Sequence, residues 1–225
     1  MSDSTTAAGS RLGQANQQER APIRPGKIVC IGRNYREHAK ELGNEVPAEP
    51  LFFLKPSSSI IGDGEVILLP EQSQQVEFEG EIGVVIGSPL TRASEGDAED
   101  AISGVLALND VTARDLQRKD SQWTRAKGFD TFCPLGSVAS APEDLSTITV
   151  VTRVNGIERQ RASAKDMVFS IGKVLSYVSH VMTLEPGDIV ATGTPSGVGP
   201  LAPGDVVEVE IEGISKVSNP VQARA

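Results

Sequence analysis

Three glutamates alternate along one short segment that leads into an apolar run. Glu77, Glu79 and Glu81 precede the apolar residues 82–86. Because the side chains of a β-strand point alternately to its two faces, a strand here would carry all three carboxylates on one face. Burying like charges without partners costs several kcal/mol each, and a divalent cation removes that cost. Carboxylate oxygens suit Mg²⁺, Mn²⁺ or Ca²⁺, so the segment is either one side of a metal site or a solvated edge strand.

His38 and Glu41 stand three residues apart in a segment predicted to be helical. In a helix their side chains would emerge on one face, where the carboxylate can hold one imidazole nitrogen and leave the other as a base. That arrangement suits the activation of water. The alternative is a polar pair on the helix surface. The second histidine, His180, falls near the end of another predicted helix, which favours a structural role.

A third carboxylate, Asp110, follows an apolar segment and precedes a polar one. At the end of a strand, Asp110 could complete a three-carboxylate metal face with Glu79 and Glu81. Arg114 and Gln117 would then lie one helical turn apart and face a substrate. The alternative is an N-capped helix with Arg114 on its surface.

Lys127 lies among small and apolar residues, and beside a carboxylate-bound cation its ammonium group could bind an anionic substrate. Alone it would be a solvated surface lysine. Residues 192–199, with the sequence TGTPSGVG, resemble a small anion-binding loop whose backbone N–H groups point at a ligand. The loop lacks the Gly-Lys-Ser/Thr ending of a phosphate loop, which argues against a nucleotide ligand.

The rest of the chain consists mainly of short segments that are either apolar or alternate between apolar and polar residues. The strands and helices that they form must position the residues named above. Period-two patterns bounded by turn residues predict strands, and an apolar stripe after Ser170 predicts the clearest helix. Helices are too few and strand spacing too irregular for alternating βαβ units, so we expect a β-rich α+β fold. The expected strands lie near residues 27–32, 51–54, 65–69, 76–86, 106–111, 146–155, 189–192 and 205–212, and the helices near 35–42, 98–105 and 170–182.

Length, charge and cysteine content narrow the class of protein. The chain has 225 residues and a net charge of −9, and without a Lys/Arg-rich stripe it is not expected to bind nucleic acid. The polar residues 1–22 predict a flexible N-terminal tail, followed by a single domain over residues 23–225. Cys30 and Cys133 are expected to be buried thiols. Because no apolar run is long enough for a membrane span and no hydrophobic signal region occurs, we expect a cytoplasmic protein without a membrane partner.

Five motifs follow one another along nearly the whole chain after the tail. They are GRNY at 32–35 with His38 and Glu41, ExEIGVVIG at 79–87, DVTARD at 110–115, WxxAK at 123–127 and TGTPSGVG at 192–199. Together, in this order, they resemble the fumarylacetoacetate hydrolase superfamily, and five ordered motifs are far more specific than any one of them. Within the superfamily the chain is most similar to the branch of acylpyruvate hydrolases and oxaloacetate decarboxylases, which also includes sequences close to 2-hydroxyhepta-2,4-diene-1,7-dioate isomerases.

The resemblance implies a mixed β-sandwich roll with a few short helices, assembled as a homodimer. It implies Mg²⁺ or Mn²⁺ held by Glu79, Glu81 and Asp110. Ile31 stands where fumarylacetoacetases carry an additional metal-ligating aspartate, which argues against fumarylacetoacetate itself as the substrate. The remaining residues implied are His38, Glu41 and Lys127 for catalysis and Arg114, Gln117 and Thr194 for binding the substrate.

The resemblance further implies an enzyme that acts on a small 2-oxo acid. In an acylpyruvate, His38 and Glu41 would activate water to cleave a C–C bond, releasing pyruvate and a carboxylic acid. Oxaloacetate would form the same enolate by losing CO₂, and in a dienedioate the same pair would move a proton between carbons. Fold similarity does not choose among hydrolysis, decarboxylation and isomerisation. A metal- and metabolite-binding module without turnover is the rival hypothesis outside the enzymes.

Overall fold

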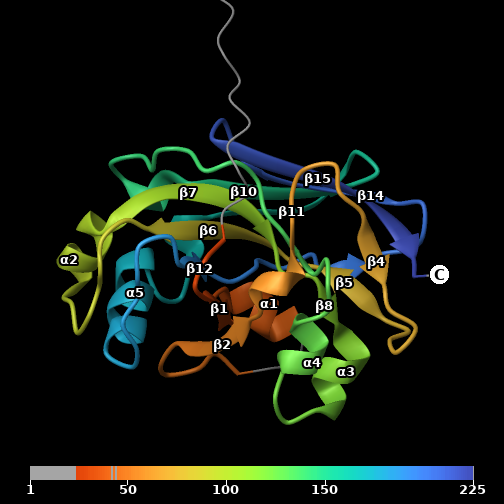
Figure 1. Cartoon of the computed structure of the whole chain (residues 1–225), viewed down its shortest axis with the longest axis horizontal. Helices are drawn as coiled ribbons and strands as arrows, with labels where there is room; N and C mark the ends of the chain where they lie inside the picture. Colours follow the sequence, from red (N-terminus) through yellow and green to blue (C-terminus); the bar gives the residue numbers. More distant parts are fainter. Residues whose placement is uncertain (1–23, 42, 44, 225) are drawn as a thin grey trace, which may run out of the picture.

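The computed structural model describes residues 24–41, 43 and 45–224 of the chain. Two five-stranded sheets form its centre, and smaller sheets and short helices surround them (Figure 1). Strands outnumber helices, which confirms the predicted β-rich α+β fold class. The tail predicted for residues 1–22 lies outside the described residues.

The first large sheet mixes parallel and antiparallel neighbours. Its order is β2 (Leu51–Lys55), β1 (Ile28–Gly32), β12 (Ile189–Ala191), β6 (Gly80–Ile86) and β7 (Ile102–Asn109). β1 and β12 run parallel, whereas the other neighbouring strands are antiparallel. Every residue of β6 is buried, as expected for a strand that is apolar apart from Glu81 and is covered on both faces.

The second large sheet has the order β11 (Ile157–Ser163), β10 (Thr149–Val154), β14 (Val206–Ile211), β15 (Ser215–Ala223) and β4 (Ile67–Leu69). β10 and β11 form a hairpin at the predicted turn, where Asn155 and Gly156 have φ angles of 53° and 77°. Two successive residues with positive φ match the twist of a β-hairpin. β15 pairs with both β14 and β4 and closes the chain onto this sheet.

Two small sheets and several short helices complete the fold. No helix within the described residues is long and apolar enough to cross a membrane. The small sheets consist of β13 (Gly199–Pro200), β5 (Val76–Phe78) and β8 (Thr112–Ala113), and of β3 (Ile60–Ile61) and β9 (Cys133–Pro134). The α-helices are α1 (Arg36–Glu41), α2 (Glu95–Asp100), α3 (Arg114–Lys119), α4 (Thr124–Lys127) and α5 (Ile171–Ser179), and 3₁₀ turns occupy Ser57–Ser59, Leu145–Thr147 and Ala164–Asp166.

Helix α5 confirms the clearest helical prediction. The Ser170 hydroxyl caps it by accepting the Lys173 N–H at 3.1 Å, as expected for a serine at this position. Its apolar stripe lies in the main hydrophobic core, where each fully buried aliphatic side chain contributes about 1.5–3 kcal/mol. A nine-residue helix is too short to be stable alone, so this burial holds it in place. The stripe consists of Ile171, Val174, Leu175 and Val178.

The helix predicted over residues 98–105 is wrong in its position. Helix α2 begins after Ser94, whose hydroxyl accepts the Asp97 N–H at 3.2 Å, and it ends at Asp100. From Ile102 the chain is instead strand β7, which pairs with β6. Residues 102–108 are largely apolar, and as a strand inside the sheet this run is buried from residue 104 onward, whereas a helix with one apolar face would leave part of it exposed.

Candidate active site

Glu79 stands where the chain passes from one sheet to another. β5 belongs to a three-stranded sheet and β6 to the first large sheet, and Glu79 lies between them outside both strands. The Glu79 N–H donates to the Asn109 side-chain oxygen at 3.0 Å, and the Asp110 N–H donates to the Glu79 carbonyl at 2.8 Å. Because β6 and β7 pair with Gly80 opposite Asn109, the residues just beyond these ends, Glu79 and Asp110, are brought together.

The structure brings together the three carboxylates that the sequence nominated for a metal site. One oxygen each of Glu79, Glu81 and Asp110 lies within 4.8 Å of the others, and all three residues are buried. Gly80 lies between the two glutamates where the sheets approach closely. A Cβ at Gly80 would lie 1.9 Å from the Thr152 hydroxyl oxygen, so only glycine fits this position without moving β10.

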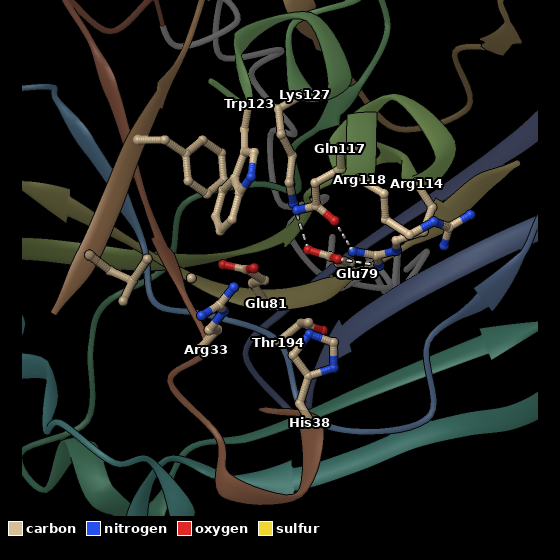
Figure 2. Close-up of a pocket in the computed structure, with 13 residues that line it drawn as sticks. Arg33, His38, Glu79, Glu81, Arg114, Gln117, Arg118, Trp123, Lys127 and Thr194 are labelled. Atoms are coloured by element: carbon tan, nitrogen blue, oxygen red, sulfur yellow. Dashed lines mark hydrogen bonds and ion pairs between the residues drawn. The ribbon is translucent and has the colours of Figure 1, made fainter. Parts of the chain in front are cut away.

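Buried cations surround two of these carboxylates. Lys127 Nζ donates to Glu79 at 2.7 Å and to Asp110 at 2.6 Å, and Lys55 Nζ donates to the other Asp110 oxygen at 2.6 Å. Arg114 also donates to Glu79, as the dashed lines of Figure 2 show. Burial alone would raise the pKa of Glu79, but the charges of Lys127 and Arg114 outweigh it and lower the pKa well below its usual value.

Glu81 has a different environment from Glu79. Its carboxylate accepts the Gly193 N–H at 2.8 Å, but it forms no ion pair with any described residue. Burial, and then the negative charges of Asp110 and Glu79, raise its pKa well above the usual value. A buried carboxylate that forms no ion pair with a described residue, within a set of hard oxygen donors, fits a divalent metal ion of the Mg²⁺ type.

The charge balance of the site supports the same fit. The carboxyl groups outnumber the cationic side chains by one, and Glu81, whose pKa is raised, is the one without an ion-pair partner among the described residues. A divalent cation would stabilise Glu81 as a carboxylate, and with all four carboxylates ionised the cluster would carry a single positive charge. The charged groups counted are the carboxylates of Glu77, Glu79, Glu81 and Asp110 and the cationic side chains of Lys55, Arg114 and Lys127.

His38 and Glu41 form the side-chain pair that their spacing predicts. His38 Nδ1 lies 3.3 Å from a Glu41 carboxylate oxygen, and His38 is buried while Glu41 is partly exposed. Burial lowers the pKa of His38 below its usual value of 6.5, although the charge of Glu79 opposes this shift. A neutral imidazole held by a carboxylate is the state required of a general base.

The glycine-rich loop after β12 holds carboxylates of this site. The Gly193 N–H donates to Glu81, and the Gly197 N–H donates to both Glu41 oxygens at 3.1 and 3.2 Å. Gly193 has a φ of 99°, and a Cβ there would lie 2.7 Å from the Asn34 Cβ, so a side chain is excluded on both grounds. The loop that was expected to bind an anion therefore donates these two backbone N–H groups to carboxylates of the protein itself.

One cavity of about 230 Å³ unites most of the predicted residues, as Figure 2 shows. Asp110 and Glu41 do not line it directly but bond to Lys127 and His38, which do. Seven of the nine residues nominated from the sequence are among those that line it. The lining residues are Ile31, Gly32, Arg33, His38, Phe53, Glu79, Glu81, Arg114, Gln117, Arg118, Trp123, Lys127 and Thr194.

The residues expected to face the substrate are held by hydrogen bonds within the protein. Arg114 donates to Gln117 at 2.6 Å and, through Nε, to Glu77 at 2.8 Å. The Thr194 hydroxyl donates to the Gly80 carbonyl at 2.9 Å. These bonds fix the orientation of the side chains around the cavity, as a preorganised site requires.

Three contributors to the site were not identified from the sequence. Lys55 is fully buried and reaches Asp110 and the carbonyl of Lys127, although it ends a strand of otherwise apolar residues. The Phe53 ring lies 5.0 Å from Lys127 Nζ, a cation–π contact. Arg33 also lines the cavity. It belongs to the motif at residues 32–41, in which only His38 and Glu41 were assigned roles from the sequence. For Lys55 the sequence did contain one signal, a lysine at the end of an apolar strand. Such a strand is expected to lie in the interior, and a buried lysine requires an anionic partner.

Replacing Lys55 by methionine should destabilise the metal-free protein by about 3–5 kcal/mol, because it leaves a buried carboxylate short of one partner. Urea denaturation measures the loss. Lys216→Met is the matched control, since Lys216 is exposed and its pair with Glu208 is solvated. The control should change stability far less, because an exposed, solvated ion pair contributes little. An equally small loss in Lys55→Met would show that Asp110 does not depend on this cation.

Comparisons with known proteins agree with this site. Residues 27–222 match the family described as fumarylacetoacetate (FAA) hydrolase, C-terminal. The oxaloacetate tautomerase YisK of Bacillus subtilis is 44% identical over 216 residues, which cover 89% of this chain and 72% of that protein. The mitochondrial oxaloacetate decarboxylase of Dictyostelium discoideum is 43% identical over 195 residues, 84% of this chain and 89% of that protein.

A solved structure shows the same fold. The 5-carboxymethyl-2-hydroxymuconate delta-isomerase of Mycobacterium smegmatis superposes with a TM-score of 0.84 at 45% identity. The match covers 91% of this chain and 82% of the isomerase. The family match extends over most of the chain, and the strand-rich fold agrees with it. This chain therefore belongs to the fumarylacetoacetate hydrolase family.

Proposed function

We propose that this protein is a divalent-cation-dependent enzyme that cleaves a C–C bond in acylpyruvate-type 2,4-dioxo acids. The observation that carries the proposal is one small cavity lined by both the carboxylate pair Glu79 and Glu81 and the histidine of the His38–Glu41 pair. A site for a cation and a general base thus stand side by side, which is the combination this reaction needs.

Glu79, Glu81 and Asp110 would hold the cation, and Mg²⁺ and Mn²⁺ suit their hard carboxylate oxygens. When bound, the cation would act as a Lewis acid toward the 2-oxo acid. Glu81 supports this assignment because it is a buried carboxylate without a cationic partner among the described residues.

His38 would act as the general base. With its proton on Nδ1 it donates to Glu41, which leaves Nε2 free to take a proton from water. The activated water attacks the C4 carbonyl, and the C3–C4 bond then breaks with its electron pair going to the enolate of pyruvate. Protonation at C3 gives pyruvate, and the acyl group leaves as a carboxylic acid. Lys127 would stabilise the negative charge that develops beside it.

Arg114, Gln117 and Thr194 would orient the substrate. All three line the cavity, and Arg114 and Gln117 bond to each other across one turn of α3. Substrate binding would exchange some of these internal bonds for bonds to the ligand, since a planar guanidinium can hold a carboxylate through two N–H groups.

Oxaloacetate chemistry is the second candidate. It is favoured by the identity of more than 40% to an oxaloacetate tautomerase and an oxaloacetate decarboxylase. Decarboxylation breaks the C–C bond to the distal carboxylate, releases CO₂ and leaves the same pyruvate enolate. Tautomerisation moves a proton between C3 and the 2-oxo oxygen, a role open to the His38–Glu41 pair.

A substrate panel tests the proposal. Purified protein with added Mg²⁺ should release pyruvate from acylpyruvates in a steady-state assay, with oxaloacetate and a dienedioate assayed in parallel. Turnover of oxaloacetate alone would favour the second candidate. Turnover of none of the three classes would contradict the assignment to 2-oxo acid chemistry.

The pH profile of hydrolysis should report His38. Because burial lowers the pKa of His38, the imidazole stays neutral, and thus a base, down to pH values below 6.5. The acid limb of kcat/KM for an acylpyruvate should therefore lie below pH 6.5, and activity should fall as pH decreases through it. An acid limb above pH 7 would mean that a different group limits the reaction.

A further inference from the structure

Arg33 has an unusual backbone conformation at the edge of the cavity. Its φ is 59°, in the left-handed region that few residues other than glycine adopt. The next residue, Asn34, is fully buried and fixes this turn through three side-chain bonds. It donates to the carbonyls of Phe169 at 3.1 Å and Thr192 at 2.8 Å and accepts the Phe169 N–H at 2.8 Å. Strain held by so many bonds commonly marks a functional position.

The turn directs Arg33 into the cavity. Figure 2 shows its side chain pointing toward Glu81 from the side opposite Lys127. Arg33 nevertheless forms no ion pair with any residue that the structure describes, and its buried Nε has no hydrogen-bond partner there. Lys127 and Arg114, by contrast, are each paired with two carboxylates.

The charge balance of the site indicates what the unpaired guanidinium of Arg33 could bind. With a divalent cation, the cluster described above carries one net positive charge, which the carboxylate of a 2-oxo acid neutralises. Arg33 lies outside that balance and adds a further positive charge on the cavity wall. A partly buried guanidinium with unused N–H donors is well placed to bind an anion, and a planar carboxylate matches its geometry.

We propose that Arg33 is a specificity-determining residue that binds a second carboxylate, so that the substrate is a dicarboxylic rather than a monocarboxylic 2-oxo acid. The inference rests on the proposed function, because it takes the first carboxylate to lie at the cation site. It narrows both candidates to one substrate class. An acylpyruvate whose acyl chain ends in a carboxylate belongs to it, as does oxaloacetate, whereas an acylpyruvate with an alkyl chain does not.

Two stable 2-oxo acids that differ in one group provide the test. 2-Oxoglutarate and 2-oxopentanoate share chain length and the 2-oxo acid head, and only the first has a distal carboxylate. Trp123 is the only tryptophan of the chain and lines the cavity, so its fluorescence reports binding, with calorimetry as a second readout. In saturating Mg²⁺ the diacid should bind roughly 10- to 100-fold more tightly, the range of one charge-assisted contact.

Arg33→Asn removes the guanidinium and keeps a residue that tolerates the left-handed conformation. It should abolish the preference for 2-oxoglutarate while leaving the affinity for 2-oxopentanoate unchanged. Arg33→Lys, which keeps the charge but not the planar fork, should retain part of the preference. Arg36→Asn is the matched control, since Arg36 is an exposed arginine of α1 outside the cavity lining, and it should keep the full preference.

The outcomes separate this inference from the proposed function. If wild-type protein binds both acids equally, or Arg33→Asn weakens both alike, the role of Arg33 is overturned while the 2-oxo acid site stands. If neither acid binds by fluorescence or calorimetry in the presence of Mg²⁺, the proposed function is overturned and the inference with it.

Discussion

Replacing Glu81 by glutamine should weaken Mg²⁺ and Mn²⁺ binding by roughly 100-fold or more without destabilising the metal-free protein. Glu81 is one of three carboxylates whose oxygens lie within 4.8 Å, and loss of its charge removes a ligand that a hard cation requires. In the metal-free protein the same carboxylate is buried beside Asp110 and Glu79 and has no cationic partner among the described residues. Because that burial raises the pKa of Glu81, neutral glutamine resembles the protonated carboxyl group that the metal-free site favours, and it still accepts the Gly193 N–H.

Calorimetric titration with Mn²⁺ and urea denaturation measure the two quantities separately. Glu77→Gln is the matched control, because Glu77 is also buried but pairs with Arg114 outside the three-oxygen group. The control should keep its metal affinity and lose stability, since Arg114 loses a buried partner. Unchanged Mn²⁺ affinity in Glu81→Gln would remove Glu81 from the metal site.

Replacing His38 by alanine should reduce acylpyruvate cleavage by about 10²- to 10⁴-fold, the usual contribution of a general base. Oxaloacetate decarboxylation should be much less affected, because loss of CO₂ requires no activated water. The structure allows the two roles to be separated, since His38 lies on α1 whereas the carboxylates lie at the ends of β6 and β7. Parallel assays of both substrates with one enzyme preparation give the ratio directly.

Two further variants serve as comparisons for His38→Ala. Glu41→Gln should resemble it in direction, because Glu41 holds His38 Nδ1 at 3.3 Å. Asp110→Ala should lose both activities, because it removes a candidate metal ligand. Equal losses of both activities in His38→Ala would contradict the division of roles and assign the histidine a part in binding either substrate.

The sequence predicted the parts of the site that depend on local spacing. His38 and Glu41 are one helical turn apart and meet as that period requires. Glu79 and Glu81 also come together, although the single strand expected over residues 76–86 is broken at Glu79 into β5 and β6, so strand alternation alone does not account for their meeting. The cap of α5 at Ser170 was likewise visible, because capping uses residues adjacent in the chain.

Features that depend on distant parts of the chain could not be predicted in this way. The pairing of Lys55 with Asp110 joins residues 55 positions apart, and nothing near either residue indicates the other. The boundary between α2 and β7 depended on pairing with β6, which outweighs local helix preference for residues 102–105. Strand β15 was not predicted from the sequence, because it includes polar residues and Pro220. In the structure it pairs with both β14 and β4.

Chelation tests the central claim most directly. The protein should be freed of metal with EDTA and dialysed, and its turnover of an acylpyruvate and of oxaloacetate measured before and after addition of Mg²⁺ or Mn²⁺. We expect both activities to disappear on chelation and to return with either ion, because the buried group of Glu79, Glu81 and Asp110 requires a cation to work. Undiminished turnover in the metal-free protein would contradict a metal-dependent enzyme.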